Sequence, residues 1–170
     1  MGRFGAVWMN GFHPLEECVA NKGAAMSVEK ILAKKGRNVI TILPEHVAGD
    51  AARLLTEHRI GVMVVCDHKG RLEGVLSERD LVKGMAKYGA ATLTMPVRNL
   101  MTTAVITCKP TDEVKDLMQT MTNRRIRHLP VMEEGRLVGI VSIGDVVNFR
   151  LQEAQMEMGV LRDYAMTRTP

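Results

Sequence analysis

The residues best suited to chemistry in this chain form two Ser-x-x-Asp turns, Ser77 with Asp80 and Ser142 with Asp145. Each turn follows an apolar run and precedes a helical pattern, so a hydroxyl, a carboxylate and a helix N-terminus should lie together. Such a turn can bind sugar hydroxyls through the carboxylate, and a phosphate through the N–H groups and dipole of the helix N-terminus. The same pattern is also a capping box, which needs no ligand. Both interpretations stay open for each turn.

The two turns belong to a longer internal repeat. The segment 70–81 recurs as 135–146, and upstream the segments 39–44 and 59–65 recur as 105–110 and 125–131. The upstream copies are 66 residues apart and the Ser-x-x-Asp copies 65, so one residue is missing between the two blocks. The missing residue falls in a polar segment that is typical of a hairpin turn, where length changes are tolerated. This pattern predicts a duplicated fold unit whose two copies pack as a pseudo-symmetric pair.

The hydrophobic pattern predicts the same elements in both copies. For the first copy we expect a short helix over 27–32, capped by Ser27 and closed by the segment 34–36. After it we expect a strand over 39–42, a helix over 47–58, strands over 62–66 and 72–76, and a helix over 78–87. For the second copy we expect the counterpart of the short helix over 96–101, a strand over 105–107, a helix over 112–123, strands over 128–132 and 137–141, and a long helix from Ile143. The predicted class is therefore α/β (α+β), with β-α-β-β-α written twice. Apolar residues along the long last helix could pack on a partner subunit or on the chain's own core, and we expect the first.

Size and composition exclude several classes of protein. A chain of 170 residues with 46% hydrophobic content can build a real core, and no apolar run approaches the roughly 20 residues of a spanning helix. Residues 1–25 match nothing in the repeat and lack the apolar core of a signal peptide, so we expect a flexible extension and a cytoplasmic protein. The three cysteines include no Cys-x-x-Cys pair, which predicts neither a disulfide framework nor a metal site.

The charge is compatible with an anionic partner. The net charge is +4 and the pI about 9.1, but aromatic residues make up only 4% and no dense Lys/Arg run occurs, which disfavours a nucleic-acid binder. A basic surface for a phosphorylated small molecule is the simpler explanation. We find no Ser-His-Asp order, metal-ligand spacing or Gly-rich phosphate loop, so an enzyme is not expected.

Together these motifs resemble the CBS domain family, named from cystathionine beta-synthase. The resemblance rests on the Thr-x-x-Pro of strand one, the Arg-Ile-x-x-x-Pro-Val block of the second copy and the two Ser-x-x-Asp turns, in order over residues 27–155. It implies a stand-alone tandem pair, a Bateman module. The expected organisation is an extension over 1–25, CBS domain 1 over 26–92, CBS domain 2 over 93–155 and a C-terminal helical tail over 156–170.

The family resemblance also implies a function and its residues. Similar pairs are sensory modules, usually not enzymes, that bind AMP, ADP, ATP, NAD(H) or S-adenosylmethionine in clefts between the repeats and commonly dimerise. No catalytic cofactor is implied. Asp80 and Asp145 would hold ribose hydroxyls, beside Ser77 and Ser142. The remaining implied ligand-binding positions are Arg59 and Arg125 for phosphate, and Val39, Thr103 and Val105 for the adenine edge.

The two copies are not equivalent. The second has Pro130 where the first has Val64, and Arg127 with His128 where the first has Gly61 with Val62. Arg124, Arg125, Arg127 and His128 make the second copy the better predicted phosphate site, and His128 can gain charge near its reference pKa of about 6.5. A solvated basic edge is the alternative for this cluster.

The expected protein is thus a homodimeric adenosine-ligand sensor that acts on an unknown effector protein. A ligand-free structural dimerisation module is the alternative, and a nucleic-acid-binding protein is less favoured.

Overall fold

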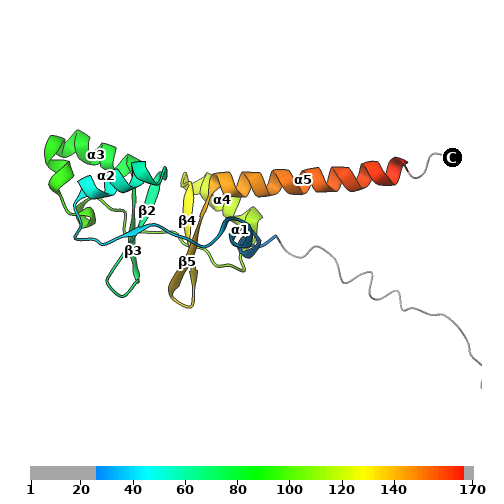
Figure 1. The fold of residues 1–170 in the computed structure, drawn as a ribbon, viewed down its shortest axis with the longest axis horizontal. Coiled ribbons are helices and arrows are strands. Elements are labelled where there is room, and N and C mark those ends of the chain that lie inside the picture. The colour runs from blue at the N-terminus through cyan, green and yellow to red at the C-terminus, as the bar shows by residue number, and fades with distance from the viewer. Residues whose placement is uncertain (1–25, 167–170) are drawn as a thin grey trace, which may run out of the picture.

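The computed structural model describes residues 26–166. Two antiparallel hairpins stand side by side, with their loops at one end and most of the helices at the other (Figure 1). The first repeat contains β1 (Thr41–Ile42), α2 (Ala48–Glu57), β2 (Val62–Cys66), β3 (Leu72–Ser77), α3 (Glu78–Tyr88) and the 3-10 helix η1 (Gly89–Thr94). The second contains α4 (Val114–Arg124), β4 (His128–Glu133), β5 (Arg136–Ser142) and α5 (Ile143–Met166). The short helices α1 (Val28–Lys35) and η2 (Val97–Asn99) precede the two repeats along the chain.

The first repeat forms the three-stranded sheet β1-β2-β3, in which β1 is parallel and β3 antiparallel to β2. The second forms only the two-stranded sheet β4-β5. The prediction of a strand over 105–107 is therefore wrong. The described chain has only a single parallel bridge next to this segment, between Cys108 and Val131, which matches the pairing of Ile42 with Val65 in the first repeat.

Pro130 explains why this strand is lost. In the first repeat the N–H of Val64 donates to the carbonyl oxygen of Ile40 at 3.4 Å. Pro130 takes the place of Val64 and has no N–H, so the equivalent bond to Ile106 cannot form. The two bonds around Cys108 that avoid this nitrogen are kept, since its N–H donates to Pro130 at 3.0 Å and its carbonyl accepts from Met132 at 2.8 Å.

The segments that precede the repeats are exchanged between them. The N–H of Val28, at the start of α1, donates to the carbonyl of Asp112, and that of Val114 donates back to Met26. In the first repeat the N–H of Val97 donates to His46, and that of Ala48 donates back to Met95. Helix α1 therefore docks on the second repeat, although it precedes the first, and η2 docks on the first.

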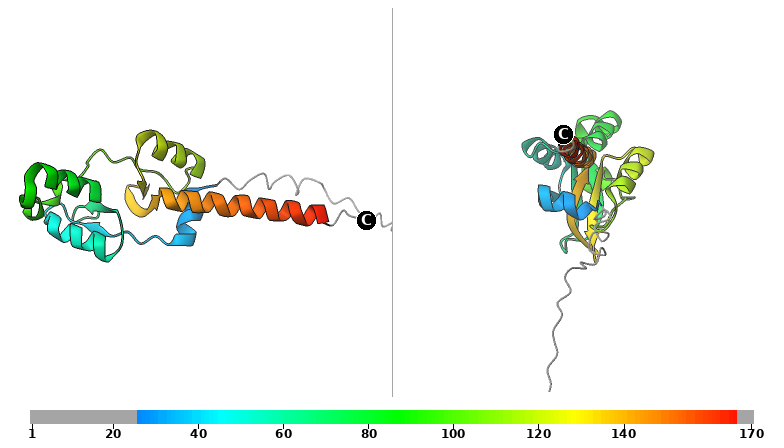
Figure 2. Two further views of the ribbon diagram at one scale, coloured as in Figure 1. Left: turned by 90° about the horizontal axis from the view of Figure 1, so that it is seen from above. Right: turned by 90° about the vertical axis from the view of Figure 1, so that its right-hand side faces the viewer.

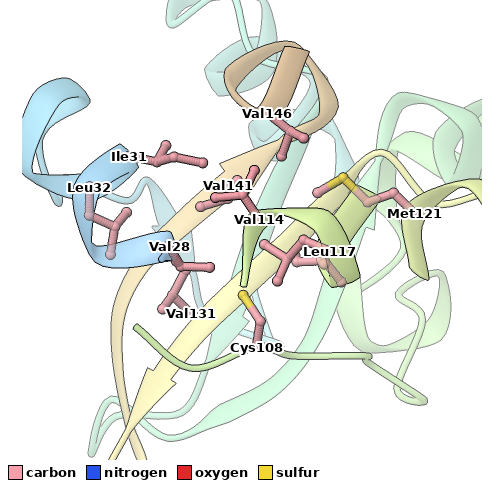
Figure 3. Close-up of a cluster of buried hydrophobic side chains, with 11 residues drawn as sticks. Val28, Ile31, Leu32, Cys108, Val114, Leu117, Met121, Val131, Val141 and Val146 are labelled. Carbon is pink, nitrogen blue, oxygen red and sulfur yellow. The ribbon is translucent and has the colours of Figure 1, made fainter. Parts of the chain in front are cut away.

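Burial follows this exchange. Val28, Ile31 and Leu32 of α1 lie in one buried cluster with residues of α4, β4 and β5 (Figure 3). Val97 of η2 lies in the other cluster, among residues of α2, β2 and β3. These side chains are almost completely removed from water, and burying a side chain of this size contributes about 1.5–3 kcal/mol.

Two glycines allow the exchanged segments to approach the sheets. A Cβ on Gly139 of β5 would lie 2.7 Å from Cδ2 of Leu32. A Cβ on Gly74 of β3 would lie 2.9 Å from both the sulfur of Met101 and the carbonyl oxygen of Thr102. The two glycines occupy equivalent places in the repeat, so close packing of the exchanged segment depends on the same missing side chain in both copies.

The other predicted elements are confirmed, with ends that shift by one or two residues for most strands and helices, except that the helix expected over 96–101 is only the 3-10 helix η2. The first short helix ends at Lys35, before Gly36, as predicted, and Ser27 occupies its N-cap position. The side chain of Ser27 makes no capping bond, so that part of the prediction is wrong. The predicted extension over 1–25 lies outside the described residues. Helix α5 extends well past the body of the molecule (Figure 2). Within residues 26–166 no helix is both long and apolar enough to cross a membrane.

Candidate functional site

The turn that joins β5 to α5 forms a closed capping box. The backbone N–H and the hydroxyl of Ser142 both donate to Oδ2 of Asp145 at 2.8 Å, and the N–H of Asp145 donates back to the hydroxyl at 3.2 Å. The structural interpretation of this Ser-x-x-Asp pattern is therefore confirmed. The other oxygen of the carboxylate is not used by the capping box, because Oδ1 accepts no hydrogen bond from the described residues.

Lys35 also contacts this carboxylate. Its Nζ lies 2.5 Å from Oδ2 of Asp145, and both side chains are less than one third exposed. Burial raises the pKa of Asp145, but the hydrogen bonds from Lys35 and Ser142 outweigh burial and hold the pKa below its usual value. Asp145 is therefore ionised at neutral pH, and both of its oxygens can only accept hydrogen bonds.

A cavity of about 330 Å³ opens beside Ser142, between the repeats. Its apolar walls come from the start of the first repeat, from β2 and from β5, and its polar groups include a lysine, an arginine, an asparagine and a histidine. The lining residues are Lys35, Asn38, Val39, Ile40, Arg59, Ile60, Gly61, Val62, His128, Ile140 and Ser142. Apolar walls with a few convergent polar groups are typical of a small-molecule site, and the volume is at the small end of the usual range.

His128 lies half-buried on the wall of this cavity. Burial lowers the pKa of its imidazole, and the positive charges of Lys35 and Arg127 lower it further, against the opposing effect of Asp145 and Glu78. His128 is therefore neutral at pH 7. A neutral imidazole there can donate and accept hydrogen bonds, and the positively charged side chains of the cavity wall are Lys35 and Arg59.

The predicted site residues separate into two groups. Val39, Arg59, His128 and Ser142 line the cavity, and Asp145 borders it through Ser142 and Lys35. The remaining predicted residues lie outside this cavity: Ser77, Asp80, Thr103, Val105, Arg125 and Arg127. Arg124, Arg125 and Arg127 are exposed, so His128 is the only member of the predicted basic cluster on the cavity wall.

Arg59 and Arg125 retain equivalent backbone geometry. Both adopt the left-handed conformation, with φ of 53° and 54°, which residues with a side chain rarely adopt. The conformation occurs just after α2 and α4 and turns the chain into β2 and β4. The cavity brings Arg59 of the first repeat to the Ser142 turn of the second, so cation and carboxylate come from opposite copies.

Lys35 and Asn38 are the functional candidates that the sequence analysis did not select. The run of two lysines before Gly36 marked the end of a helix, which the structure confirms. Its relation to Asp145, 110 residues away in the chain, follows from the docking of α1 on the second repeat. No local pattern in the sequence indicates that exchange.

The turn before α3 is also a closed capping box, but its surroundings differ. The N–H and hydroxyl of Ser77 donate to Oδ2 of Asp80 at 2.9 and 2.5 Å, and the N–H of Asp80 donates back at 3.3 Å. No ion pair to Asp80 occurs among the described residues. The two turns thus share a backbone design, and only the one at Asp145 adds a cation.

Metal and thiol chemistry find little support in the part of the chain that the structure describes. There, no group of three or more His, Cys, Asp and Glu side chains could hold a metal ion. Cys66 and Cys108 are free and buried. Burial raises the pKa of both thiols, that of Cys108 to about 12, which leaves them protonated and unreactive.

The family model described as "CBS domain" matches residues 28–87 and 97–152. The chain belongs to the CBS domain family. The two matches correspond to the two repeats, which makes the protein a tandem CBS pair with the fold of a Bateman module.

Individual CBS proteins agree with this assignment. The chain is 30% identical to the mitochondrial CBS domain-containing protein CBSX3 of Arabidopsis thaliana over 81% of this chain and 71% of the relative. The solved CBS-domain containing protein ATU1752 from Agrobacterium tumefaciens is 46% identical, with a TM-score of 0.72 over 76% of this chain and 96% of that one.

A third similar structure contains ligands. It is the CBS domain pair of protein MJ0100, solved in complex with 5′-methylthioadenosine and S-adenosyl-L-methionine. That pair is 27% identical to this chain, with a TM-score of 0.65 over 77% of this chain and 98% of its own. Pairs of CBS domains serve as regulatory modules, and at least this one binds adenosine compounds.

Proposed function

We propose that this CBS pair is a regulatory module, not an enzyme, which binds an adenosine-containing ligand in the cavity beside Asp145. The observation that carries the proposal is the carboxylate of Asp145. It is held by Ser142 and Lys35 through Oδ2, and Oδ1 has no partner among the described residues. An ionised, positioned carboxylate with one unused oxygen suits the two hydroxyls of a ribose.

The rest of the cavity matches the other parts of such a ligand. Val39, Ile40 and Val62 provide apolar surface for a purine base, and Lys35 and Arg59 provide charge for a phosphate. A Cβ on Gly144, the second residue of α5, would meet only the hydroxyl oxygen of Ser142, at 3.6 Å, so a phosphate could approach its N–H closely. The ligand of MJ0100 supports the adenosine class.

Among the regulatory ligands AMP, ADP, ATP and NAD(H), the small cavity favours a mononucleotide. A volume of about 330 Å³ matches one nucleoside unit. The two positive side chains favour phosphorylated ligands over the cationic S-adenosylmethionine. We therefore rank AMP and ADP first.

The output of binding would pass through a homodimer to an effector protein. Exposed apolar side chains support this part of the proposal: Val82 and Met85 of α3 are 65% and 50% exposed, and Val147 of α5 is 52% exposed. Val82 and Val147 are equivalent in the repeat, so the two helices present related apolar faces. A cytoplasmic location stays a prediction, and the relative CBSX3 is mitochondrial by its name.

Isothermal titration of the full chain with AMP, ADP, ATP, NAD, NADH and S-adenosylmethionine tests the proposal. Asp145→Asn keeps the shape of the side chain and removes its charge, so we expect affinity to fall about 10- to 100-fold, as loss of a charged hydrogen bond implies. Asp80→Asn is the matched control at the equivalent turn and should leave this site unchanged. Unchanged affinity in a folded Asp145→Asn variant would contradict the assignment.

A ligand-free structural module is the second candidate. The observation in its favour is that both Ser-x-x-Asp turns are complete capping boxes without a ligand. No heat of binding with any of the six compounds would favour this candidate. A nucleic-acid-binding role is supported only by the net charge of +4.

A further inference from the structure

Helix α5 is much longer than the domain requires. It runs from Ile143 to Met166, a length of 24 residues, whereas the CBS match ends at residue 152. The remainder projects away from both repeats as a single helix (Figures 1 and 2). At 1.5 Å per residue this projection spans roughly 20 Å. An isolated helix of that length is marginal in water, so a packing partner would stabilise it.

One face of α5 carries a heptad pattern. Val147, Leu151, Ala154 and Met158 follow one another at alternating spacings of four and three residues, and the sequence continues this spacing with Leu161 and Ala165. We call these six residues the heptad stripe. Val147, Leu151 and Met158 are 52%, 55% and 57% exposed, and Ala154 is exposed as well. An apolar stripe at this period, exposed at Val147, Leu151, Ala154 and Met158, is typical of the seam of a two-stranded coiled coil.

We propose that α5 pairs along the heptad stripe with α5 of a second copy of this chain, in parallel and in register. This inference rests on the homodimer of the proposed function and adds its geometry. A second copy fits because the stripe is self-complementary and because it begins at Val147, on the apolar face that the body of the molecule already exposes.

The charges beside the stripe select the parallel arrangement. In a parallel pair the residue just before one core position faces the residue five places later on the other helix, which sets Glu157 against the partner's Arg162. An antiparallel pair that aligns the same stripe would set Glu157 against the partner's Glu157. Opposite charges stabilise the first arrangement and like charges destabilise the second.

The pairing depends on the rest of the dimer. The heptad stripe has fewer than three heptads and contains alanine at two core positions, so it is weak alone. Contacts between the CBS bodies would hold the two helices at high effective concentration and make the pairing favourable. The stripe therefore strengthens and orients the dimer.

Two methionines provide a matched test of the stripe. Met158 lies on it, and Met156, two residues earlier and 70% exposed, lies on the opposite face. We expect Met158→Glu to weaken the dimer at least tenfold in sedimentation experiments on the full chain, because it buries two charges in the seam. Met156→Glu should have no effect. Equal dissociation constants for the two variants would overturn the proposal.

Cysteine cross-linking tests register and direction. In a Cys18→Ser background, where the remaining Cys66 and Cys108 are buried, Ala154→Cys should form a disulfide-linked dimer on mild oxidation and Met156→Cys should not. Linkage only in a mixture of Ala154→Cys with Met158→Cys would show the antiparallel arrangement and overturn ours. A dimer that neither links nor responds to Met158→Glu would refute the coiled coil alone, whereas a monomeric chain would refute the homodimer as well.

Discussion

Lys35 and Asp145 form an ion pair of 2.5 Å between a helix that precedes the first repeat and a helix that begins after the last strand of the second. The pair joins the beginning and the end of the tandem unit at the wall of the cavity. It is also the contact that a ribose would share or displace, since both groups lie where the proposed ligand binds.

Replacing Lys35 should separate recognition of the phosphate from recognition of the nucleoside. Lys35→Ala removes a positive charge from the cavity and frees Oδ2 of Asp145, so we expect AMP to bind about tenfold more weakly while uncharged adenosine binds equally well or better. Titration with both compounds measures the difference. Lys34→Ala, at the exposed neighbouring position, is the control. A parallel loss for adenosine would show that Lys35 acts through the fold and not on the phosphate.

Stability should depend on pH through His128. Its pKa is lower in the folded chain than the unfolded value of about 6.5, first because of burial, so the unfolded state binds more protons between these two values. The contribution of neutral His128 to the free energy of unfolding should therefore be fully present above about pH 6.5 and be lost as the pH falls below this value.

Urea unfolding at pH 7.5 and pH 5.5 measures this loss. His128→Asn should show a smaller loss between the two pH values than the natural chain. His58→Asn, at the exposed end of α2, should show the natural dependence. If His128→Asn keeps the full pH dependence, other groups carry it.

Packing of the exchanged segments should be sensitive to a single methyl group. Gly74→Ala places a Cβ 2.9 Å from the carbonyl oxygen of Thr102, a backbone atom that is fixed by its pairing with Val75. We expect a loss of about 1–3 kcal/mol in the free energy of unfolding. Gly159→Ala, which meets no atom within 4 Å in α5, should cause no loss because alanine favours a helix. Equal stability of the two variants would contradict this packing.

Most of the fold follows from local sequence patterns. The residues of β2 are all buried and those of β3 alternate in burial toward its end, as their sequence patterns predict. Both Ser-x-x-Asp turns cap helices. The strand over 105–107 shows where pattern fails, since its own residues suit a strand and the obstacle is Pro130 on the neighbouring strand. An edge strand depends on donors in its partner, which a local window does not contain.

The candidate site was less predictable than the fold. The repeated turn points to the carboxylate Asp145 and the family resemblance to the cation Arg59, but their meeting across two copies is a property of the packing. Lys35 reaches the site because α1 docks on the second repeat, through backbone bonds to Asp112 and Pro110. Those acceptors are carbonyl oxygens that every residue has, so no side-chain pattern marks them.

The exchange of α1 and η2 has a further consequence for how the module unfolds. Each half of the chain supplies part of the hydrophobic core of the other, with Leu32 buried in one cluster and Val97 in the other. Neither repeat can lose its structure without exposing apolar surface in its neighbour. We therefore expect the two copies to unfold in a single cooperative transition, and a gene cut between them to yield two fragments that each lack a piece of their own interior.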